Sequence, residues 1–286
     1  MNAPVRYLEG SGGLVSGSPV RFLKGHGTGN DFVVLPDHEL ELTAELARAL
    51  CDRRTGLGAD GVLRVAPSAD GDGWYMDHRN ADGSTAEMCG NGLRLLARYL
   101  VDSGRASAGS EQRIGTRSGL RRAVVGSDGS VRVEMGPARL GSASVAVVGD
   151  DSFTGTAVSM GNPHLVCLIE VPVASLDLHR PPVVDAASFP EGVNVEFGNV
   201  GVLDGVDRQV TMRVHERGVG ETQACGTGAC ALAATVLGGA HGIVAVDQPG
   251  GRVLVDVADD GCWLTGPAVV VATGELDPAW LSAALS

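Results

Sequence analysis

The chain has 286 residues, enough for two domains of ordinary size, each with its own hydrophobic core. Its net charge is −12 and no stretch is dominated by Lys and Arg, which argues against nucleic acid or an anionic membrane as a partner. Glycine accounts for 42 residues and aromatic residues for only 4%, a composition that predicts short strands joined by tight turns.

The first ordered elements are expected after an N-terminal extension. Residues 1–20 are rich in Gly and Ser without periodicity, and we expect them to be disordered. A strand over 20–24 and a second over 31–35 flank a turn of Gly and Asn residues, which could present the amide of Asn30 to a site. An ordinary hairpin turn has the same pattern. A helix is predicted over 43–51, with Thr43 as its N-cap.

The middle of the chain leads to the first unusual motif. A Gly-rich loop over 53–61 precedes a strand over 62–65, and a second strand covers 74–78. A polar turn that contains Asn80 follows, and then Cys89-Gly90-Asn91-Gly92 opens an apolar helical pattern. Strands are expected over 120–125 and 131–135, with the second half of the chain beginning near 137.

The second half repeats these features. A strand–turn–strand pattern over 157–166 contains Asn162, and Asn194 lies in a turn before another strand. A strand over 210–215 leads into Glu216-Arg217 and the motif Cys-Gly-Thr-Gly at 225–228, which opens a second apolar helix. Further strands are expected around 244–246, 253–257 and 269–271. We expect halves at 21–137 and 138–273, and a C-terminal segment over 274–286 that packs back on the first half.

The two Cys motifs indicate an internal duplication. They lie 136 positions apart, and the Gly-Asn pairs at 29–30 and 161–162 lie 132 positions apart, in the same order. Two related halves that face each other would place two helix N-termini, each led by a thiol, on opposite sides of one cleft.

A thiol at a helix N-terminus has a distinctive chemistry. The first amides of a helix have no partner within it, and the helix dipole leaves partial positive charge there, so the thiol should be shifted toward thiolate. Two such thiols suggest inversion at a carbon, with one removing a proton and the other returning a proton on the opposite face. The amides of Gly90, Asn91, Gly226 and Thr227 could stabilise the negative charge that develops on a neighbouring carboxylate.

The cysteine spacing and the absence of cofactor and targeting motifs bear on the cofactors and the cellular location of the protein. The six cysteines show neither a CxxC pair nor a zinc spacing, and we expect Cys51, Cys167, Cys230 and Cys262 to be structural. No Lys lies in a motif typical of a pyridoxal phosphate site and no metal-ligand cluster is evident, so cofactor-free chemistry is predicted. Without a signal peptide or a long apolar run, a cytoplasmic protein is expected.

Together these motifs resemble those of the diaminopimelate epimerase family, which interconverts LL- and meso-2,6-diaminopimelate in lysine and peptidoglycan precursor synthesis. The resemblance runs from His26 to Gly228 and includes 265–268. It implies an α/β (α+β) fold of two pseudo-symmetric domains, each a curved, mostly antiparallel sheet around a central helix. It also implies a homodimer.

The resemblance assigns roles to individual residues. Cys89 and Cys225 match the catalytic acid/base pair, and His164 and Glu216 match residues that tune the two thiols. The planar fork of Arg217 suits the distal carboxylate of the substrate. The matching substrate-binding positions are Asn30, Asn80, Gly90, Asn91, Asn162, Asn194, Glu216, Arg217, Gly226 and Thr227.

Two positions depart from the family. Gly61 stands where many members have Gln, so no side-chain contact with the substrate can come from there. Ala272 stands where some members have an aromatic dimer contact, which questions that contact but not dimerisation itself.

Other functions remain open at this point. A related racemase or epimerase of proline or hydroxyproline would use both thiols, but its substrate has no second amino-acid end for Arg217, Asn194 and Asn80 to bind. A phenazine-type isomerase of the same fold lacks the paired thiols. A non-catalytic redox sensor would instead join Cys89 to Cys225 in a disulfide. Activity under reducing conditions discriminates against this last alternative.

Overall fold

The computed structural model describes residues 20–36, 39–68, 71 and 73–285, so residues 1–19 of the expected extension lie outside the described part. The chain forms two compact units. The first contains the segments up to Gly27, Asp31–Val133 and from Pro267 onward, and the second contains Thr28–Asn30 and Glu134–Gly266. These limits differ from the expected ones at 137 and 273. At the C-terminal limit the reason is β18 (Val269–Glu275), which pairs antiparallel with β1 (Arg21–Gly27) of the first unit.

The described part of the first unit carries three helices. Its elements, in addition to β1 and β18, are β2 (Asn30–Leu35), α1 (Ala44–Cys51), β3 (Gly61–Pro67), β4 (Trp74–Asn80), α2 (Gly90–Asp102), β5 (Glu111–Thr116), β6 (Gly119–Val125), β7 (Val131–Gly136) and α4 (Pro278–Ala284). The predicted helix over 43–51 is confirmed. Thr43 accepts a hydrogen bond from the Leu46 amide at 3.2 Å, and Leu46 and Leu50 are fully buried.

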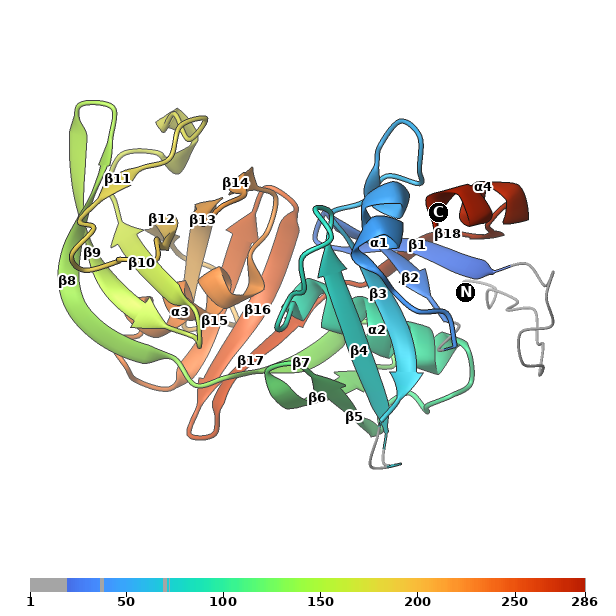
Figure 1. Ribbon diagram of the computed structural model, residues 1–286. Helices are drawn as coiled ribbons and strands as arrows, with labels where there is room; N and C mark the ends of the chain where they lie inside the picture. The colour runs from blue at the N-terminus through green and yellow to red at the C-terminus, as the bar shows by residue number, and fades with distance from the viewer. Residues whose placement is uncertain (1–19, 37–38, 69–70, 72, 286) are drawn as a thin grey trace. The chain divides into compact units, whose positions relative to one another are not determined.

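The second unit contains one long helix among strands. Its elements are β8 (Arg139–Val148), β9 (Asp151–Ser159), β10 (Pro163–Leu168), η1 (Val173–Ser175), β11 (Val183–Val184), β12 (Asn194–Gly201), β13 (Arg208–Glu216), β14 (Gly220–Thr222), α3 (Gly226–Val236), β15 (Gly242–Gln248), β16 (Gly251–Ala258) and β17 (Gly261–Gly266). Figure 1 shows the elements of both units.

The two units repeat one order of strand pairings. In the first, β2 pairs parallel with β3, β3 antiparallel with β4, β4 parallel with β5, and β5, β6 and β7 follow as antiparallel neighbours. In the second, β10, β12, β13, β15, β16 and β17 pair in the same sequence of parallel and antiparallel contacts. This repetition confirms the internal duplication predicted from the Cys motifs.

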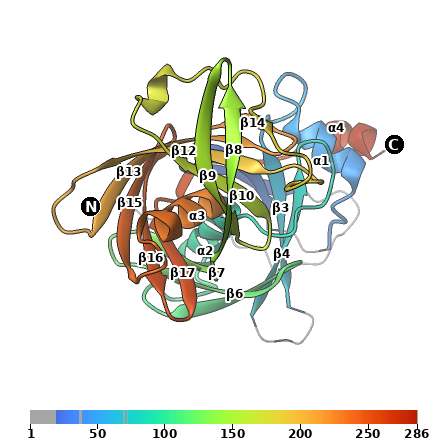
Figure 2. The same ribbon diagram turned by 90° about the vertical axis from the view of Figure 1, so that its left-hand side faces the viewer.

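Each unit wraps its strands around one helix. Helix α2 packs against β1, β3, β6 and β18, and α3 packs against β9, β10, β12, β13, β15, β16 and β17. Figure 2 shows α3 among these strands. Because α3 has neighbours on several sides, almost all of its residues are buried, and small ones such as Ala229 and Ala233 let the strands approach. At Gly198 of β12 a Cβ would lie only 2.8 Å from the Leu232 side chain of this helix.

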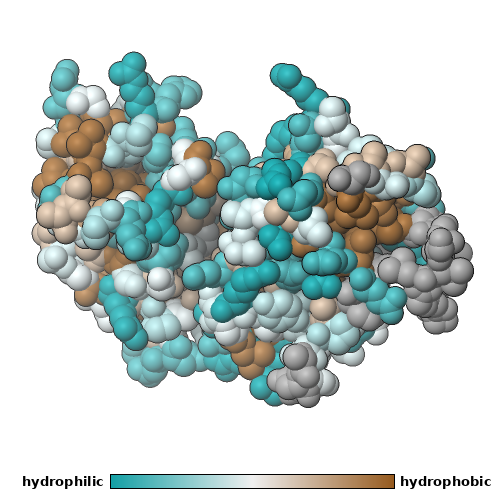
Figure 3. Space-filling view, in the orientation of Figure 1, coloured by the Kyte–Doolittle hydropathy of each residue, from teal (hydrophilic) through white to brown (hydrophobic). Residues whose placement is uncertain are grey.

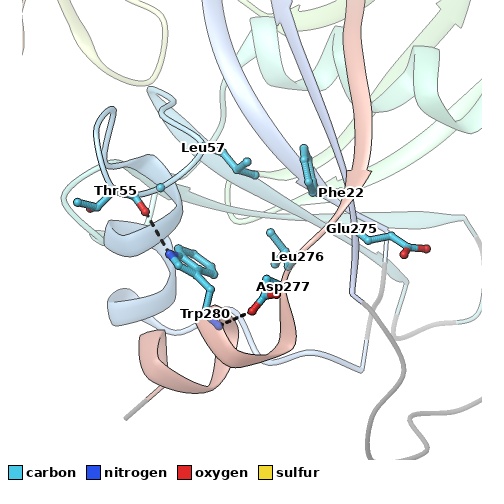
Figure 4. A pocket seen from close by; sticks show the side chains of 8 residues that line it. Phe22, Thr55, Leu57, Glu275, Leu276, Asp277 and Trp280 are labelled. Carbon is cyan, nitrogen blue, oxygen red and sulfur yellow. Dashed lines mark hydrogen bonds between the residues drawn. The ribbon is translucent and has the colours of Figure 1, made fainter.

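A satellite core joins the C-terminal helix to the first unit. Trp280 of α4 packs with the buried cluster around α1, and its indole N–H donates to the Thr55 carbonyl at 3.1 Å. A cavity of about 210 Å³ beside it is lined by Phe22, Leu57 and Leu276, among others (Figure 4). In Figure 3 hydrophobic side chains gather over the part of this unit where Figure 1 places β1, β2 and α4. None of the predicted site residues lines this cavity.

The ring of His78 is buried without a hydrogen-bond partner among the described residues. The residue is 4% exposed, and neither ring nitrogen has such a partner. The ring instead meets Phe32 edge to face, with centroids 5.6 Å apart. Burial, helped by the positive charge of Arg117, lowers the pKa of His78 to about 4 from its ordinary 6.5.

This histidine should make the protein sensitive to mild acid. Between the pKa of about 4 in the folded chain and the ordinary 6.5, the unfolded chain binds a proton that the folded chain does not. The free energy of unfolding should therefore fall as pH drops through this window, by up to about 3 kcal/mol. Urea titrations across the window should show a weaker pH dependence for His78→Leu than for the unsubstituted chain. Equal slopes for the two proteins would contradict this prediction.

Candidate active site

In the first unit, Cys89 is the N-cap of α2. Its backbone is extended (φ −137°, ψ 117°), and its sulfur accepts a hydrogen bond from the Gly92 amide at 3.5 Å. The thiol is partly exposed. Gly90 and Asn91 form the first helical positions, whose amides have no partner within the helix. The predicted place of Cys89 at a helix N-terminus is confirmed.

The first turn of α2 is held from behind by a buried arginine. Arg94 is fully buried, donates from Nη2 to the Asn91 side-chain oxygen at 3.0 Å and donates from Nε to the Pro267 carbonyl at 3.1 Å. Strand β1 approaches this turn closely at its end. A Cβ at Gly27 would lie 2.9 Å from Arg94 Nη2 and 3.0 Å from the Asn91 carbonyl, so only glycine fits.

In the second unit, Cys225 is the N-cap of α3 in nearly the same conformation. Its φ and ψ are −121° and 116°, and the Gly228 amide donates to its sulfur at 3.3 Å. The Thr227 hydroxyl lies 3.5 Å from the same sulfur. The backbone amide of Cys225 donates to the side-chain oxygen of Gln248, at 2.8 Å. Gln248 ends β15, and no motif in the sequence marked it.

The turn that carries Asn30 belongs to the second unit. Thr28 is the one non-glycine residue of the described chain with a positive φ (51°). Its carbonyl approaches Gly250 so closely that a Cβ there would lie 1.8 Å away. The Gly250 amide donates to the Gln223 carbonyl at 2.8 Å, two residues before Cys225. Thr28, two residues before Asn30, thus packs against the segment that contacts the loop before the second thiol.

The pKa of the Cys225 thiol is raised well above its ordinary value, chiefly by burial and then by the nearby Glu216 and Glu196 carboxylates. Hydrogen bonds from Thr227 and Gly228 oppose this rise without cancelling it. The expectation that the helix N-terminus leaves this thiol shifted toward thiolate is therefore not met. The hydrogen bond from the Gly228 amide at the start of α3 lowers the pKa as expected, but burial and the two carboxylates outweigh it.

Glu216 lies at the end of β13, beside the second Cys motif. It accepts a hydrogen bond from the Thr222 hydroxyl, and burial raises its pKa. A hydrogen bond with the Cys225 thiol and the charge of His164 act in the opposite direction. Glu216 and Cys225 are therefore direct neighbours that influence each other's protonation.

Asn194 anchors the backbone that precedes Arg217. It is 5% exposed and is the first residue of β12. Its side-chain oxygen accepts from the Arg217 amide at 3.0 Å, and its side-chain nitrogen donates to the Pro163 carbonyl at 2.9 Å. The Arg217 side chain is exposed and donates from Nη1 to the Glu191 carbonyl at 3.3 Å.

His164 is completely buried at the start of β10. Its Nδ1 lies 2.7 Å from a carboxylate oxygen of Glu196, also completely buried, and its Nε2 lies 3.0 Å from the Asn162 side-chain oxygen. The Asn162 side-chain nitrogen donates to the Thr227 hydroxyl at 3.4 Å. Glu196 was missed at the level of sequence, where it resembles any acidic residue in a strand.

Asn80 and Gly61 are two further positions of the first unit that the sequence analysis singled out. Asn80 ends β4, is exposed, and donates to the Ser84 hydroxyl at 3.0 Å. Gly61 begins β3, and a Cβ there would lie 2.8 Å from the Arg79 carbonyl and 2.9 Å from His78 Nε2. A side chain such as Gln at this position would require these neighbours to move.

The other four cysteines are buried, as expected. Burial raises the pKa of Cys51 to about 11, and burial together with the Glu196 charge raises that of Cys167 to about 12. Neither thiol caps a helix, since Cys51 ends α1 and Cys167 lies within β10. Across the described ranges, no three His, Cys, Asp or Glu side chains are grouped as metal ligands.

Known proteins share this combination of motifs. The sequence pattern described as diaminopimelate epimerase matches residues 22–141 and 156–276. The chain belongs to the diaminopimelate epimerase family. Among curated members, the diaminopimelate epimerase of Mycolicibacterium smegmatis is 50% identical over 290 residues, covering 91% of this chain and 97% of the relative. That of Thermobifida fusca is 48% identical over 276 residues, covering 90% and 98%.

Solved structures confirm the fold expected for this family. A phenazine biosynthesis protein of the PhzF family from Bacillus anthracis superposes with a TM-score of 0.70 at 14% identity, over 91% of this chain and 99% of that chain. A hydroxyproline epimerase from Agrobacterium vitis gives a TM-score of 0.64 at 15% identity, over 91% and 94%. At this identity the likeness concerns the fold, whereas the diaminopimelate epimerase relatives define the family.

Proposed function

We propose that this chain interconverts LL-2,6-diaminopimelate and meso-diaminopimelate without a cofactor, with Cys89 and Cys225 as the two acid/base groups. One observation carries the proposal: in a chain of the diaminopimelate epimerase family, both cysteines cap a helix in nearly the same conformation. Each sulfur accepts a hydrogen bond from the amide three residues later, so each thiolate has a donor that stabilises it.

The proposed reaction needs both thiols in different protonation states. One thiolate takes the α-proton, so that an S–H bond forms while the Cα–H bond breaks. The electron pair of that bond moves toward the adjacent carboxylate. The other thiol then donates its proton to the opposite face of the carbon. The raised pKa of Cys225 favours its thiol form, so we assign to Cys225 the proton that is donated to the carbon.

The reacting carboxylate needs donors because an α-proton is only weakly acidic. The first amides of α2 and α3, at Gly90, Asn91, Gly226 and Thr227, lack partners within their helices and suit this role. Helix dipoles add partial positive charge at the same places.

The distal amino-acid end of the substrate requires its own recognition. We assign its carboxylate to the Arg217 guanidinium, a planar donor that can bind a carboxylate through two hydrogen bonds. Asn194 fixes the Arg217 backbone, and Glu216 offers an acceptor for the distal ammonium. Asn30, Asn80 and Asn162 are assigned to substrate contacts by the same family pattern.

A homodimer in the cytoplasm completes the proposal. None of the helices in the described part of the chain is long and apolar enough to cross a membrane. Ala272 is exposed on β18, next to the exposed Val271, so a dimer contact at this strand would rest on aliphatic side chains rather than on an aromatic one.

Solvent isotope exchange tests the reaction directly. In deuterium oxide, the chain should incorporate deuterium at the α-position of LL-diaminopimelate and form the meso isomer. Dialysis against a chelator and treatment with hydroxylamine should leave this activity unchanged, because the two thiols supply all the proton transfers. Loss of activity that pyridoxal phosphate or a metal restores would refute the cofactor-free mechanism. Epimerisation of proline or hydroxyproline in preference to diaminopimelate would refute the substrate.

A further inference from the structure

We infer that Glu196 is a positioning residue for the Cys225 thiol and that it acts through His164 and the two side chains beyond it. The inference rests on the proposed function, in which Cys225 transfers a proton. Glu196 is not among the residues that the resemblance to the diaminopimelate epimerase family assigns to the site. The structure nevertheless places this carboxylate at the far end of a continuous hydrogen-bond chain that ends at the reacting sulfur.

The pair of Glu196 and His164 is built into neighbouring strands. Strands β10 and β12 are parallel, with His164 opposite Asn194, so Glu196 lies two residues further along β12 on the same face. Helix α3 packs against both strands. Neither side chain has any exposed surface, and Nδ1 lies 2.7 Å from Oε1.

The chain of hydrogen bonds has one direction. The Asn162 side-chain oxygen can only accept, so His164 Nε2 must carry a proton and donate to it. The Asn162 nitrogen then donates to the Thr227 hydroxyl oxygen. The hydroxyl proton of Thr227 remains available for the Cys225 sulfur, 3.5 Å away. Together with the Gly228 amide, it gives the thiolate two donors.

Glu196 supports this arrangement because it holds the ring of His164 at its other nitrogen. Oε1 lies 2.7 Å from Nδ1, so the ring is held at both nitrogens, by Glu196 and by Asn162. If Glu196 were lost, only the contact with Asn162 would hold the ring, and the orientation of Asn162 and Thr227 would no longer be fixed.

Burying this carboxyl group is costly, which argues against a purely structural role. Its second oxygen, Oε2, has no hydrogen-bond partner among the residues that the structure describes. A buried ion pair is often less stabilising than apolar side chains of similar volume. The N-terminus of α3 also approaches closely, since a Cβ at Gly228 would lie 2.6 Å from Oε1. The positive end of the helix dipole favours a negative charge there.

Several titratable groups face Glu196. His164 and Cys167 come from β10, Glu216 from β13, and Cys225 from the N-terminus of α3. The Glu196 charge raises the pKa of Cys225, after burial and Glu216. Removing this charge while keeping the shape of the side chain should therefore make the thiolate of Cys225 easier to form. The series of hydrogen bonds that orients the thiolate would be interrupted at the same time.

Glu196→Gln tests the inference kinetically. We expect kcat/KM for diaminopimelate to fall about 10- to 100-fold, by analogy with the loss of side chains that orient metal ligands. Asp247→Asn is the matched control, because it also removes a carboxylate from an ion pair of the same unit, with Arg252 at 2.6 Å, and should have no effect. In combination with His164→Asn, Glu196→Gln should cause no further loss. Additive losses would show that Glu196 does not act through His164.

The reactivity of the thiol gives a readout that needs no turnover. Alkylation by iodoacetamide, followed by peptide mapping across a pH series, reports the thiolate fraction of Cys225, with Cys89 as an internal reference. In Glu196→Gln the midpoint for Cys225 should fall, whereas that for Cys89 should not change. If Glu196→Gln changes neither the midpoint for Cys225 nor kcat/KM, the inference is overturned. Because this assay does not depend on catalysis, its outcome is separate from any failure of the proposed reaction.

A measurement on the unsubstituted protein covers the case in which Glu196→Gln does not fold. Nitrogen-15 NMR of the histidine rings should show that Nε2 of His164 carries a proton and that Nδ1 is hydrogen-bonded to a carboxyl group. An Nε2 without a proton would reverse the donor–acceptor direction of these hydrogen bonds and overturn the inference.

Discussion

Cys89→Ser and Cys225→Ser should each reduce the rate of epimerisation by about 10³-fold or more, because each removes one of the two acid/base groups. A serine hydroxyl is a far weaker acid than a thiol and is almost never ionised at neutral pH. Inversion needs a proton to leave one face and another to arrive at the opposite face, so the remaining thiol cannot compensate. The measurement is the rate of meso-diaminopimelate formation from the LL isomer under reducing conditions.

The same substitutions should leave the structure intact. Both cysteines occupy N-cap positions and accept a hydrogen bond from the amide three residues later, a role that serine fills well. The thermal midpoints of the variants should therefore match that of the unsubstituted chain. Cys51→Ala and Cys167→Ala are the controls, because these thiols are buried and cap no helix. These substitutions should alter stability at most and leave kcat unchanged. Full activity in either serine variant would contradict the two-thiol mechanism.

Much of the fold was predictable because its signals are local. The helix at α1 follows from a Thr cap and apolar spacing, and the helices after Cys89 and Cys225 follow from a Gly-rich turn before an apolar run. The internal repeat was readable because both motifs recur in the same order. Strands β8 and β17 and helix α4 were not predicted. β8 is largely exposed, and α4 buries none of its residues completely.

The surroundings of Cys225 could not be predicted, because they are made by residues distant in sequence. Glu196 lies 32 positions from His164, and Gln248 lies 23 positions from Cys225. Neither residue belongs to a motif. The direction of the Cys225 pKa was missed for the same reason: the helix dipole is visible in the sequence, whereas burial and the two carboxylates arise only from tertiary packing.

Asn194 shows how a motif residue can be recognised without its role being clear. Its position in the family pattern predicts a substrate contact, and the structure shows both ends of its amide bound to the backbone, at Arg217 and Pro163. A side chain that holds the segment carrying a binding residue is needed as much as the binding residue itself. Its contribution to substrate recognition is therefore expected to operate in part through Arg217.

Arg217→Ala should lower kcat/KM for LL-diaminopimelate by about 10²-fold or more, because it removes a charge-assisted contact with the distal carboxylate. The side chain is exposed and makes one hydrogen bond to the Glu191 carbonyl, so its loss should not unfold the chain. Arg217→Lys should recover only part of the activity, since an ammonium cannot form the two parallel hydrogen bonds of a guanidinium.

The control for this variant is Arg252→Ala, which removes an exposed arginine from an ion pair with Asp247 in the same unit and should leave kcat/KM unchanged. Discrimination is the sharper readout. The unsubstituted chain should strongly prefer diaminopimelate to an analogue without the distal carboxylate, and Arg217→Ala should lose most of that preference because the contact that distinguishes the two is gone. If Arg217→Ala epimerises diaminopimelate as efficiently as the unsubstituted chain, the guanidinium does not bind the substrate. The distal carboxylate must then be recognised by other residues, and the assignment of diaminopimelate loses its main physical argument.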